Sequence, residues 1–121
     1  MSKLDSIISK LMKDYGSAIR DVKVSGKIDR FYLRSPQLNY LFGGGFPIGR
    51  IIQFHGPESG GKSTLATYIG GDIQKRPDHN VVIYVDFERT FDESFANRLG
   101  LDTSPDKFVF LRPENGEEGF A

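Results

Sequence analysis

The chain has no cysteine, and it has only two histidines among its 121 residues. Without cysteine, disulfide scaffolds, thiolate zinc sites and cysteine nucleophiles are all excluded. The histidines, His55 and His79, stand at no recognisable ligand spacing, so they do not predict a metal site. Sixteen Lys and Arg balance sixteen Asp and Glu, giving a formal net charge of zero. This balance argues against a segment that binds nucleic acid through a basic excess.

Long apolar runs are absent as well. No uninterrupted apolar stretch approaches the roughly 20 residues that a membrane helix needs. The N-terminal sequence MSKLDSIISKLMKDYG lacks the separate regions and cleavage site of a secretory signal. A content of 38% hydrophobic and 26% charged residues is typical of a soluble globular protein, and the length suits one small domain. We therefore expect a cytoplasmic protein with no membrane partner.

The N-terminal residues have the pattern of an amphipathic helix. Ser2 or Ser6 could cap it and Gly16 could end it. Residues 17–27 then read as a polar linker. Two interpretations stay open here: the apolar stripe packs on the chain's own core, or it docks on a neighbouring subunit. The stripe, at spacings i, i+3, i+4, i+7 and i+8, consists of Leu4, Ile7, Ile8, Leu11 and Met12.

The rest of the chain alternates strand and helix patterns. Ser35 followed by Pro36 predicts a helix start, and the short helix must end before the glycines at 43–45. Further helices are expected at residues 62–74, weakened by two internal glycines, and at 92–99. Strands are expected at residues 31–33, 50–55, 81–85 and 108–111. From residue 50 onward this order predicts a parallel sheet with helical crossovers.

Residues 56–63, GPESGGKS, match the phosphate-loop pattern G-x-x-x-x-G-K-[ST] between a predicted strand and a predicted helix. The backbone N–H groups of such a loop wrap a phosphate, helped by the positive end of the following helix. Lys62 would neutralise phosphate charge, and the Ser63 hydroxyl would ligate Mg²⁺. The alternative is a glycine-rich turn that happens to precede Lys and Ser; the strand–loop–helix context favours nucleotide binding. The residues of this loop are Gly56, Pro57, Glu58, Ser59, Gly60, Gly61, Lys62 and Ser63.

A second polar cluster, DFERTFD at residues 86–92, follows the predicted strand 81–85. Acidic residues just past the carboxyl end of a parallel strand lie at the edge where ligands of open α/β sheets bind. A carboxylate there could polarise the water that attacks a γ-phosphate. The alternative is that Asp86 or Asp92 caps a helix while Glu88 is solvated. Spacing alone does not decide between the two.

Together these motifs resemble the core ATPase of bacterial RecA recombinases. The resemblance rests on GGGFPIGRII at residues 43–52, on the phosphate loop extended to Thr64, on VDFERTFD at 85–92 and on RPENGEE at 112–118. It covers roughly residue 31 to the C-terminus and, more loosely, the N-terminal helix. Phe87 and Arg89, which flank the glutamate, are closer to a phage-type or distant member.

The resemblance implies an α/β fold, in which an N-terminal helix precedes the first part of a RecA-like phosphate-loop NTPase parallel sheet. Residues 1–30 would be an oligomerisation helix and linker, and residues 31–121 the N-terminal portion of the ATPase core. The family's Walker B aspartate, DNA-binding loops and C-terminal domain would follow residue 121. Since further strands would lie between runs 51–54 and 81–85, we expect the isolated 121 residues to be marginally folded and inactive.

The resemblance also implies residue roles. Glu88 would polarise the attacking water, with Lys62 as the second catalytic residue, and ATP and Mg²⁺ would be the cofactors. Asp92 would hydrogen-bond the adenine amino group, and Phe95 would pack against the ring. The N-terminal helix would dock on the next subunit of a homo-oligomeric filament, and the function would be ATP-dependent strand exchange on single-stranded DNA. The alternatives are a non-enzymatic short form that binds nucleotide or caps a filament, or another RecA-fold ATPase such as a hexameric helicase.

Overall fold

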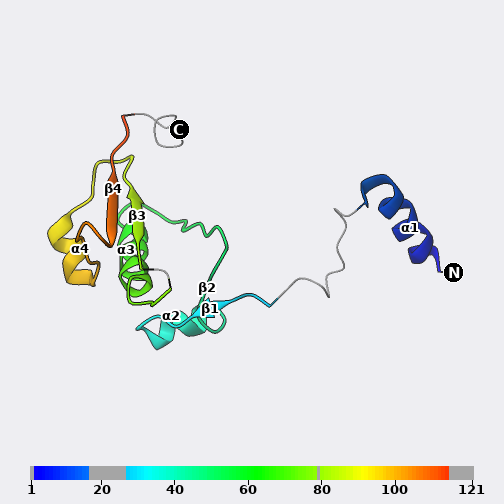
Figure 1. Ribbon diagram of the computed structural model, residues 1–121, viewed down its shortest axis with the longest axis horizontal. Helices are drawn as coiled ribbons and strands as arrows, with labels where there is room; N and C mark the ends of the chain where they lie inside the picture. Colours follow the sequence, from blue (N-terminus) through cyan, green and yellow to red (C-terminus); the bar gives the residue numbers. More distant parts are fainter. Residues whose placement is uncertain (1, 17–26, 79, 115–121) are drawn as a thin grey trace.

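The computed structural model describes residues 2–16, 27–78 and 80–114 (Figure 1). Helices and strands alternate along these residues, which confirms the expected α/β class. The predicted linker and the helix start expected near residue 115 fall largely or wholly outside the described residues. The elements, in chain order, are α1 (Lys3–Tyr15), β1 (Arg30–Phe31), α2 (Pro36–Leu41), β2 (Phe46–Pro47), α3 (Lys62–Ile73), β3 (Val82–Val85), α4 (Glu93–Leu99) and β4 (Phe108–Leu111).

Helix α1 begins and ends where the sequence predicts. Ser2, rather than Ser6, is the N-cap: its hydroxyl accepts a hydrogen bond from the Asp5 N–H at 3.1 Å, and the Asp5 carboxylate accepts one from the Ser2 N–H at 2.9 Å. The Asp5 carboxylate also accepts a hydrogen bond from the Ser2 hydroxyl at 2.7 Å, and this bond, together with the one from the Ser2 N–H, lowers the pKa of Asp5. Gly16, at φ 54°, ends the helix. No residue of α1 is buried in the described structure, so its apolar stripe faces outward.

Strand β1 is shorter than the run of residues 31–33 predicted for it. It pairs antiparallel with β2 over two residues only, with Phe31 opposite Phe46. The pairing cannot extend because the Asn39 side chain bonds both backbone groups of Leu33, at 2.7 Å to its N–H and 2.8 Å to its carbonyl. The cap and proline start of α2 are confirmed, with Ser35 accepting from the Leu38 N–H.

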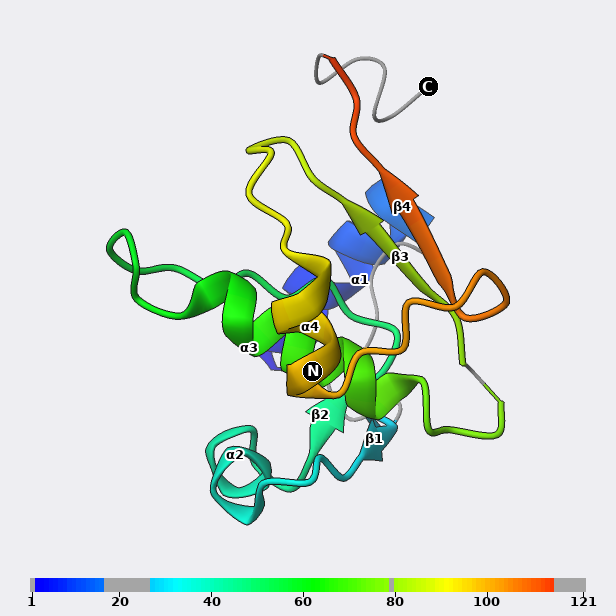
Figure 2. The ribbon, with the colours of Figure 1, turned by 90° about the vertical axis from the view of Figure 1, so that its left-hand side faces the viewer.

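Strands β3 and β4 form the predicted parallel pair, and Figure 2 shows them running in the same direction. Val82 lies opposite Phe108 and Val85 opposite Leu111. Because the strands are parallel, their carboxyl ends meet at one edge of the pair. Tyr84 packs at this pair against Phe91, with ring centroids 4.8 Å apart. The pair thus brings the residues that follow the two strands, Asp86 and Arg112, to the same edge.

Helices α3 and α4 lie side by side (Figures 1 and 2), and two glycines in α3 make their close approach possible. A Cβ atom at Gly71 would lie 2.6 Å from the Gly100 carbonyl oxygen, a distance that requires backbone movement. A Cβ at Gly70 would meet Leu101 Cδ1 at 3.3 Å. The two glycines reduce helix propensity as expected, but they allow α3 to contact the turn that ends α4.

The strand predicted at residues 50–55 is wrong for this structure. Residues 51–57 belong to no helix or strand, and the described strands pair only as β1 with β2 and β3 with β4. An extended run is a strand only when its backbone bonds a neighbour, and none of the described strands lies against this run. Figure 1 shows the segment passing apart from β3 on its way to α3.

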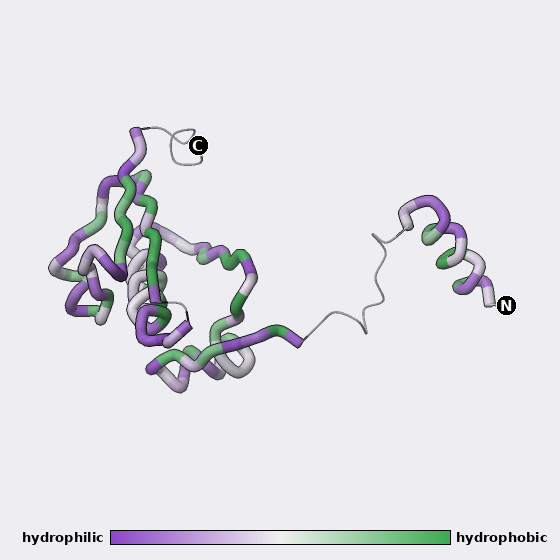
Figure 3. Tube along the Cα trace, in the orientation of Figure 1, coloured by the Kyte–Doolittle hydropathy of each residue, from purple (hydrophilic) through white to green (hydrophobic). Residues whose placement is uncertain are grey.

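The described residues bury little apolar surface. Their buried apolar residues are Leu33, Ile69, Ala96 and Leu101. Apolar residues of the strands and of the run before α3 stay open: Ile83 is 65% exposed and Ile51 is fully exposed. Figure 3 shows these hydrophobic stretches along β3, β4 and the preceding segment. No helix among the described residues has the length and apolar character to cross a membrane.

The glycine pair of α3 yields a stability prediction. Gly71→Ala in the full-length protein should lower the free energy of unfolding by about 1–3 kcal/mol, because the added methyl group meets backbone that cannot move alone. Gly70→Ala is the matched control: its contact is with a side chain, and alanine restores about 1 kcal/mol of helix propensity. Denaturant unfolding of both variants measures the difference. Equal effects would show that the α3–α4 contact does not require Gly71.

Candidate functional site

The phosphate-loop motif forms an irregular loop at the N-terminus of α3. Gly61 is the N-cap residue at φ 88°, in the left-handed region, and α3 has no side-chain cap. Ser59 also has a positive φ, 56°. A Cβ at Gly60 would lie 2.9 Å from the Pro57 carbonyl oxygen, so a side chain there would distort the turn. The first-turn N–H groups of α3 are therefore left without a side-chain acceptor, as an anion site requires.

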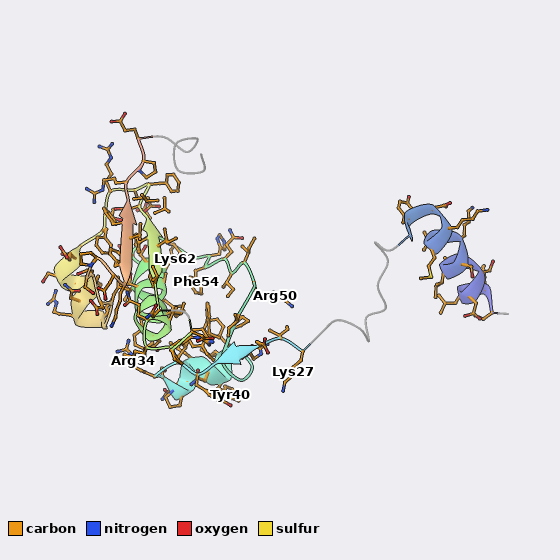
Figure 4. All side chains as sticks on the ribbon, in the orientation of Figure 1. Lys27, Arg34, Tyr40, Arg50, Phe54 and Lys62 are labelled. Carbon is orange, nitrogen blue, oxygen red and sulfur yellow. The ribbon has the colours of Figure 1, made fainter. Side chains whose placement is uncertain are left out.

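Lys62 lies at the start of α3 (Figure 4). Its Nζ donates hydrogen bonds to the carbonyl oxygens of Gly56 at 2.9 Å and Pro57 at 2.8 Å. These bonds hold the ammonium group against the loop, where it adds a full positive charge to the partial charge of the helix end. Ser63 follows Lys62 in the exposed first turn. Thr67, one turn later, bonds the Ser63 carbonyl through its hydroxyl at 2.8 Å.

A cavity of about 580 Å³ brings the two predicted clusters together. The phosphate loop and the start of α3 form one wall, and Glu88 and Thr90 form the other. Glu88 is expected near the loop, because it follows the carboxyl end of a parallel strand. Thr90 carries no motif of its own, and its one signal in the sequence is its position between Glu88 and Asp92. The lining residues are Glu58, Ser59, Gly60, Gly61, Lys62, Ser63, Thr64, Glu88 and Thr90.

The loop that carries Glu88 is held by hydrogen bonds to the side chain of Asp86. This carboxylate is 5% exposed and accepts hydrogen bonds from backbone N–H groups of Glu88, Arg89 and Phe91. Burial acts to raise the pKa of Asp86, but the backbone hydrogen bonds and Arg112 together hold it below the ordinary value of 3.8. Asp86 is therefore ionised at neutral pH. It caps a loop, and not the helix suggested by the sequence.

Asp92 and Phe95 lie at the start of α4. Asp92 caps this helix by accepting from the Phe95 N–H at 2.9 Å, so the capping alternative is confirmed for Asp92. Phe95 is 41% exposed, and the Arg98 guanidinium stands 5.6 Å from its ring centroid. Neither residue lines the cavity beside the phosphate loop. Their assignment to the adenine of a nucleotide stays a prediction.

The chemical character of the cavity suits a polyphosphate. One wall offers the N–H groups of a helix terminus, the Lys62 ammonium group and the hydroxyls of Ser63 and Thr64. The described residues contain no cluster of His, Cys, Asp or Glu side chains that could hold a metal ion by itself. Magnesium suits such a site because it commonly takes one or two protein oxygens together with phosphate oxygens. Ser63 lines the cavity, and its assignment as a ligand of Mg²⁺ stays a prediction.

A family model described as the RecA N-terminal domain matches residues 2–121. Protein RecA of Lactobacillus johnsonii is 37% identical over 120 residues, which are 96% of this chain and 32% of that protein. Protein RecA of Bifidobacterium breve is 37% identical over 120 residues, covering 95% of this chain and 29% of that protein. Protein RecA of Clostridium beijerinckii is 34% identical over 124 residues, covering 98% and 33%. The chain thus spans about a third of the length of these relatives, and it belongs to the RecA family, matching that family's N-terminal domain.

Proposed function

We propose that this chain supplies the ATP-binding front part of a DNA recombinase. The observation that carries the proposal is the cavity in which Lys62 and Ser63 of the phosphate loop face the Glu88 loop. Phosphate-binding donors on one side and a carboxylate on the other are the two parts needed for ATP hydrolysis. Membership of the RecA family adds the expectation of strand exchange.

In this proposal each part of the site has a separate task. The first-turn N–H groups of α3 and the Lys62 ammonium group bind the β- and γ-phosphates. Ser63 contributes an oxygen to Mg²⁺, and the bound ion would supply further positive charge at the phosphates. Glu88 orients a water molecule toward the γ-phosphate and accepts its proton. Asp92 and Phe95 bind the adenine in this scheme.

The partners that we propose are single-stranded DNA and further copies of the same protein in a cytoplasmic filament. The formal charge of zero gives residues 1–121 no basic excess for DNA binding, so we assign no DNA contact to them. Helix α1 is the candidate for the subunit contact, because its apolar stripe is exposed over its whole length. Each of these assignments is supported by the match to the RecA N-terminal domain.

Lys62→Ala in the full-length protein should weaken ATP binding or turnover severely, because a methyl group cannot replace the charge on the phosphates. Titration with a fluorescent ATP analogue and a steady-state ATPase assay measure the two effects. Lys75→Ala is a suitable control: this lysine is exposed and follows the far end of α3. Unchanged ATP binding and hydrolysis in Lys62→Ala would refute the nucleotide site.

Glu88→Gln separates the chemical step from binding. If Glu88 accepts the proton of the attacking water, the variant should keep its affinity for ATP and lose hydrolysis by about 10²-fold or more. It should also remain longer on single-stranded DNA, since hydrolysis would no longer release the filament. Hydrolysis at the normal rate would show that Glu88 is a solvated surface carboxylate.

Replacement of Ile8 and Leu11 by Ser tests the role of α1. Each side chain would contribute about 2 kcal/mol if a neighbouring subunit covered it fully. We expect the double variant to lose filaments in sedimentation and electron microscopy, with little change in the melting temperature of the monomer. Replacement of Lys3 and Lys10, also on α1, by Ser is the matched control. A large fall in the monomer's melting temperature would show instead that α1 packs on its own domain.

A further inference from the structure

Asp86 is a buried carboxylate for which the proposed reaction has no direct use. It stands immediately after β3, two residues before Glu88, and it does not line the cavity beside the phosphate loop. Among the described residues, its side chain accepts hydrogen bonds from the Glu88 loop and from Arg112. We propose that Asp86 and Arg112 are a positioning pair: together they hold the Glu88 loop in place opposite the phosphate loop. This proposal rests on the proposed role of Glu88.

The hydrogen bonds of Asp86 define the backbone path around Glu88. One carboxylate oxygen, Oδ1, accepts from the Glu88 N–H at 3.2 Å and from the Arg89 N–H at 2.9 Å. The other, Oδ2, accepts from the Phe91 N–H at 3.0 Å. Hydrogen bonds to an ionised acceptor are shorter and stronger than neutral ones. A single side chain therefore ties down the backbone of the loop at and beyond Glu88.

The conformation of this loop needs such an anchor. Arg89 has φ 59°, in the left-handed region that residues with a Cβ rarely occupy. A strained residue of this kind persists only where its surroundings determine its conformation, and such residues cluster at functional sites. The Arg89 N–H donates a hydrogen bond directly to the Asp86 carboxylate. Phe91 is the next residue whose N–H donates to Asp86, and its ring centroid lies 4.8 Å from that of Tyr84 and 4.9 Å from that of Phe110. These ring contacts fix the end of the loop on the strands.

Arg112 reaches Asp86 because of the parallel register. The Asp86 N–H donates to the Leu111 carbonyl at 2.9 Å, so Asp86 and Arg112 are the first residues past the ends of β3 and β4. The Arg112 guanidinium lies 3.4 Å from Asp86 Oδ2 and 5.2 Å from the Phe110 ring centroid. A positive charge beside a buried carboxylate offsets part of the free energy lost on removing it from water. Arg112 thus connects the end of β4 to the anchor of the Glu88 loop.

The exposure of Glu88 makes this anchor matter for the reaction. The side chain of Glu88 is exposed, so packing around it does not fix its position. Its distance from the phosphate loop is set by the backbone that Asp86 holds. A displacement of about 1 Å in a reacting group can lower a rate by about 10²-fold. Asp86 should therefore affect the chemical step far more than nucleotide affinity.

The test uses the full-length protein with Asp86→Ala, Glu88→Gln and the double variant. We expect Asp86→Ala to lower kcat for ATP by about 10- to 100-fold, with the affinity for a fluorescent ATP analogue changed less than about two-fold. In the double variant kcat should be close to that of Glu88→Gln alone, because a positioning residue has no effect once its target is removed. Asp102→Asn is the matched control: this carboxylate also caps a loop, accepting from the Ser104 N–H at 3.0 Å, but it precedes β4 and does not touch the Glu88 loop.

Arg112 provides a second test that keeps the buried anchor in place and covers the case in which Asp86→Ala does not fold. Arg112→Gln should lower kcat several-fold, and Arg112→Lys should restore most of it by returning the charge. Normal turnover in Asp86→Ala or in Arg112→Gln, beside a strong loss in Glu88→Gln, would overturn the positioning pair and leave the proposed function intact. An additive loss in the double variant would overturn it too. Normal turnover in Glu88→Gln would overturn the proposed role of Glu88 and the positioning pair with it.

Discussion

The parallel pairing of β3 with β4 is the constraint on which the candidate site depends. Parallel strands end at the same edge, so the strand register alone brings together the residue after Val85 and the residue after Leu111. On one side this edge places Asp86 beside Arg112, and through Asp86 it sets the path of the loop to Glu88. On the other side, the chain between β3 and β4 forms α4, which packs beside α3. Helix α3 in turn carries the phosphate loop, so one pairing relates both walls of the cavity.

Much of this arrangement was predictable because it follows from local chemistry. Ser2, Ser35 and Asp92 begin helices, since each accepts a hydrogen bond from a first-turn N–H group. Gly100, at φ 102°, ends α4, because glycine has no Cβ and adopts this left-handed conformation without steric strain. The phosphate loop has a sequence pattern because its backbone excludes side chains at defined positions. Each of these features depends on residues a few positions apart.

The features that the sequence did not predict depend on residues far apart in the chain. The strand expected at residues 50–55 has the correct apolar pattern, but a pattern does not supply a backbone partner. Strand β1 stops early because Asn39 occupies the backbone of Leu33, a contact that no propensity describes. The sequence leaves Asp86 and Asp92 as alternative helix caps, because the spacing of Asp86 from α4 does not reveal the loop that its carboxylate holds through hydrogen bonds. Arg112 is 26 residues from Asp86, and only the strand register brings the two together.

Because the apolar core is small, hydrogen bonds from polar side chains fix the relative positions of several elements. The buried Asp72 of α3 accepts from the Arg34 backbone N–H at 2.9 Å and from its guanidinium, while that guanidinium donates to the Leu99 carbonyl at 2.8 Å. Gln74, just after α3, bonds the backbone of Asp102 and Lys107 on the way to β4. Hydrogen bonds of this kind have strict geometry, and leaving one partner buried and unpaired costs about 1–3 kcal/mol. They therefore fix the far end of α3 relative to α4 and β4, whereas the phosphate-loop end of the same helix has no side-chain cap.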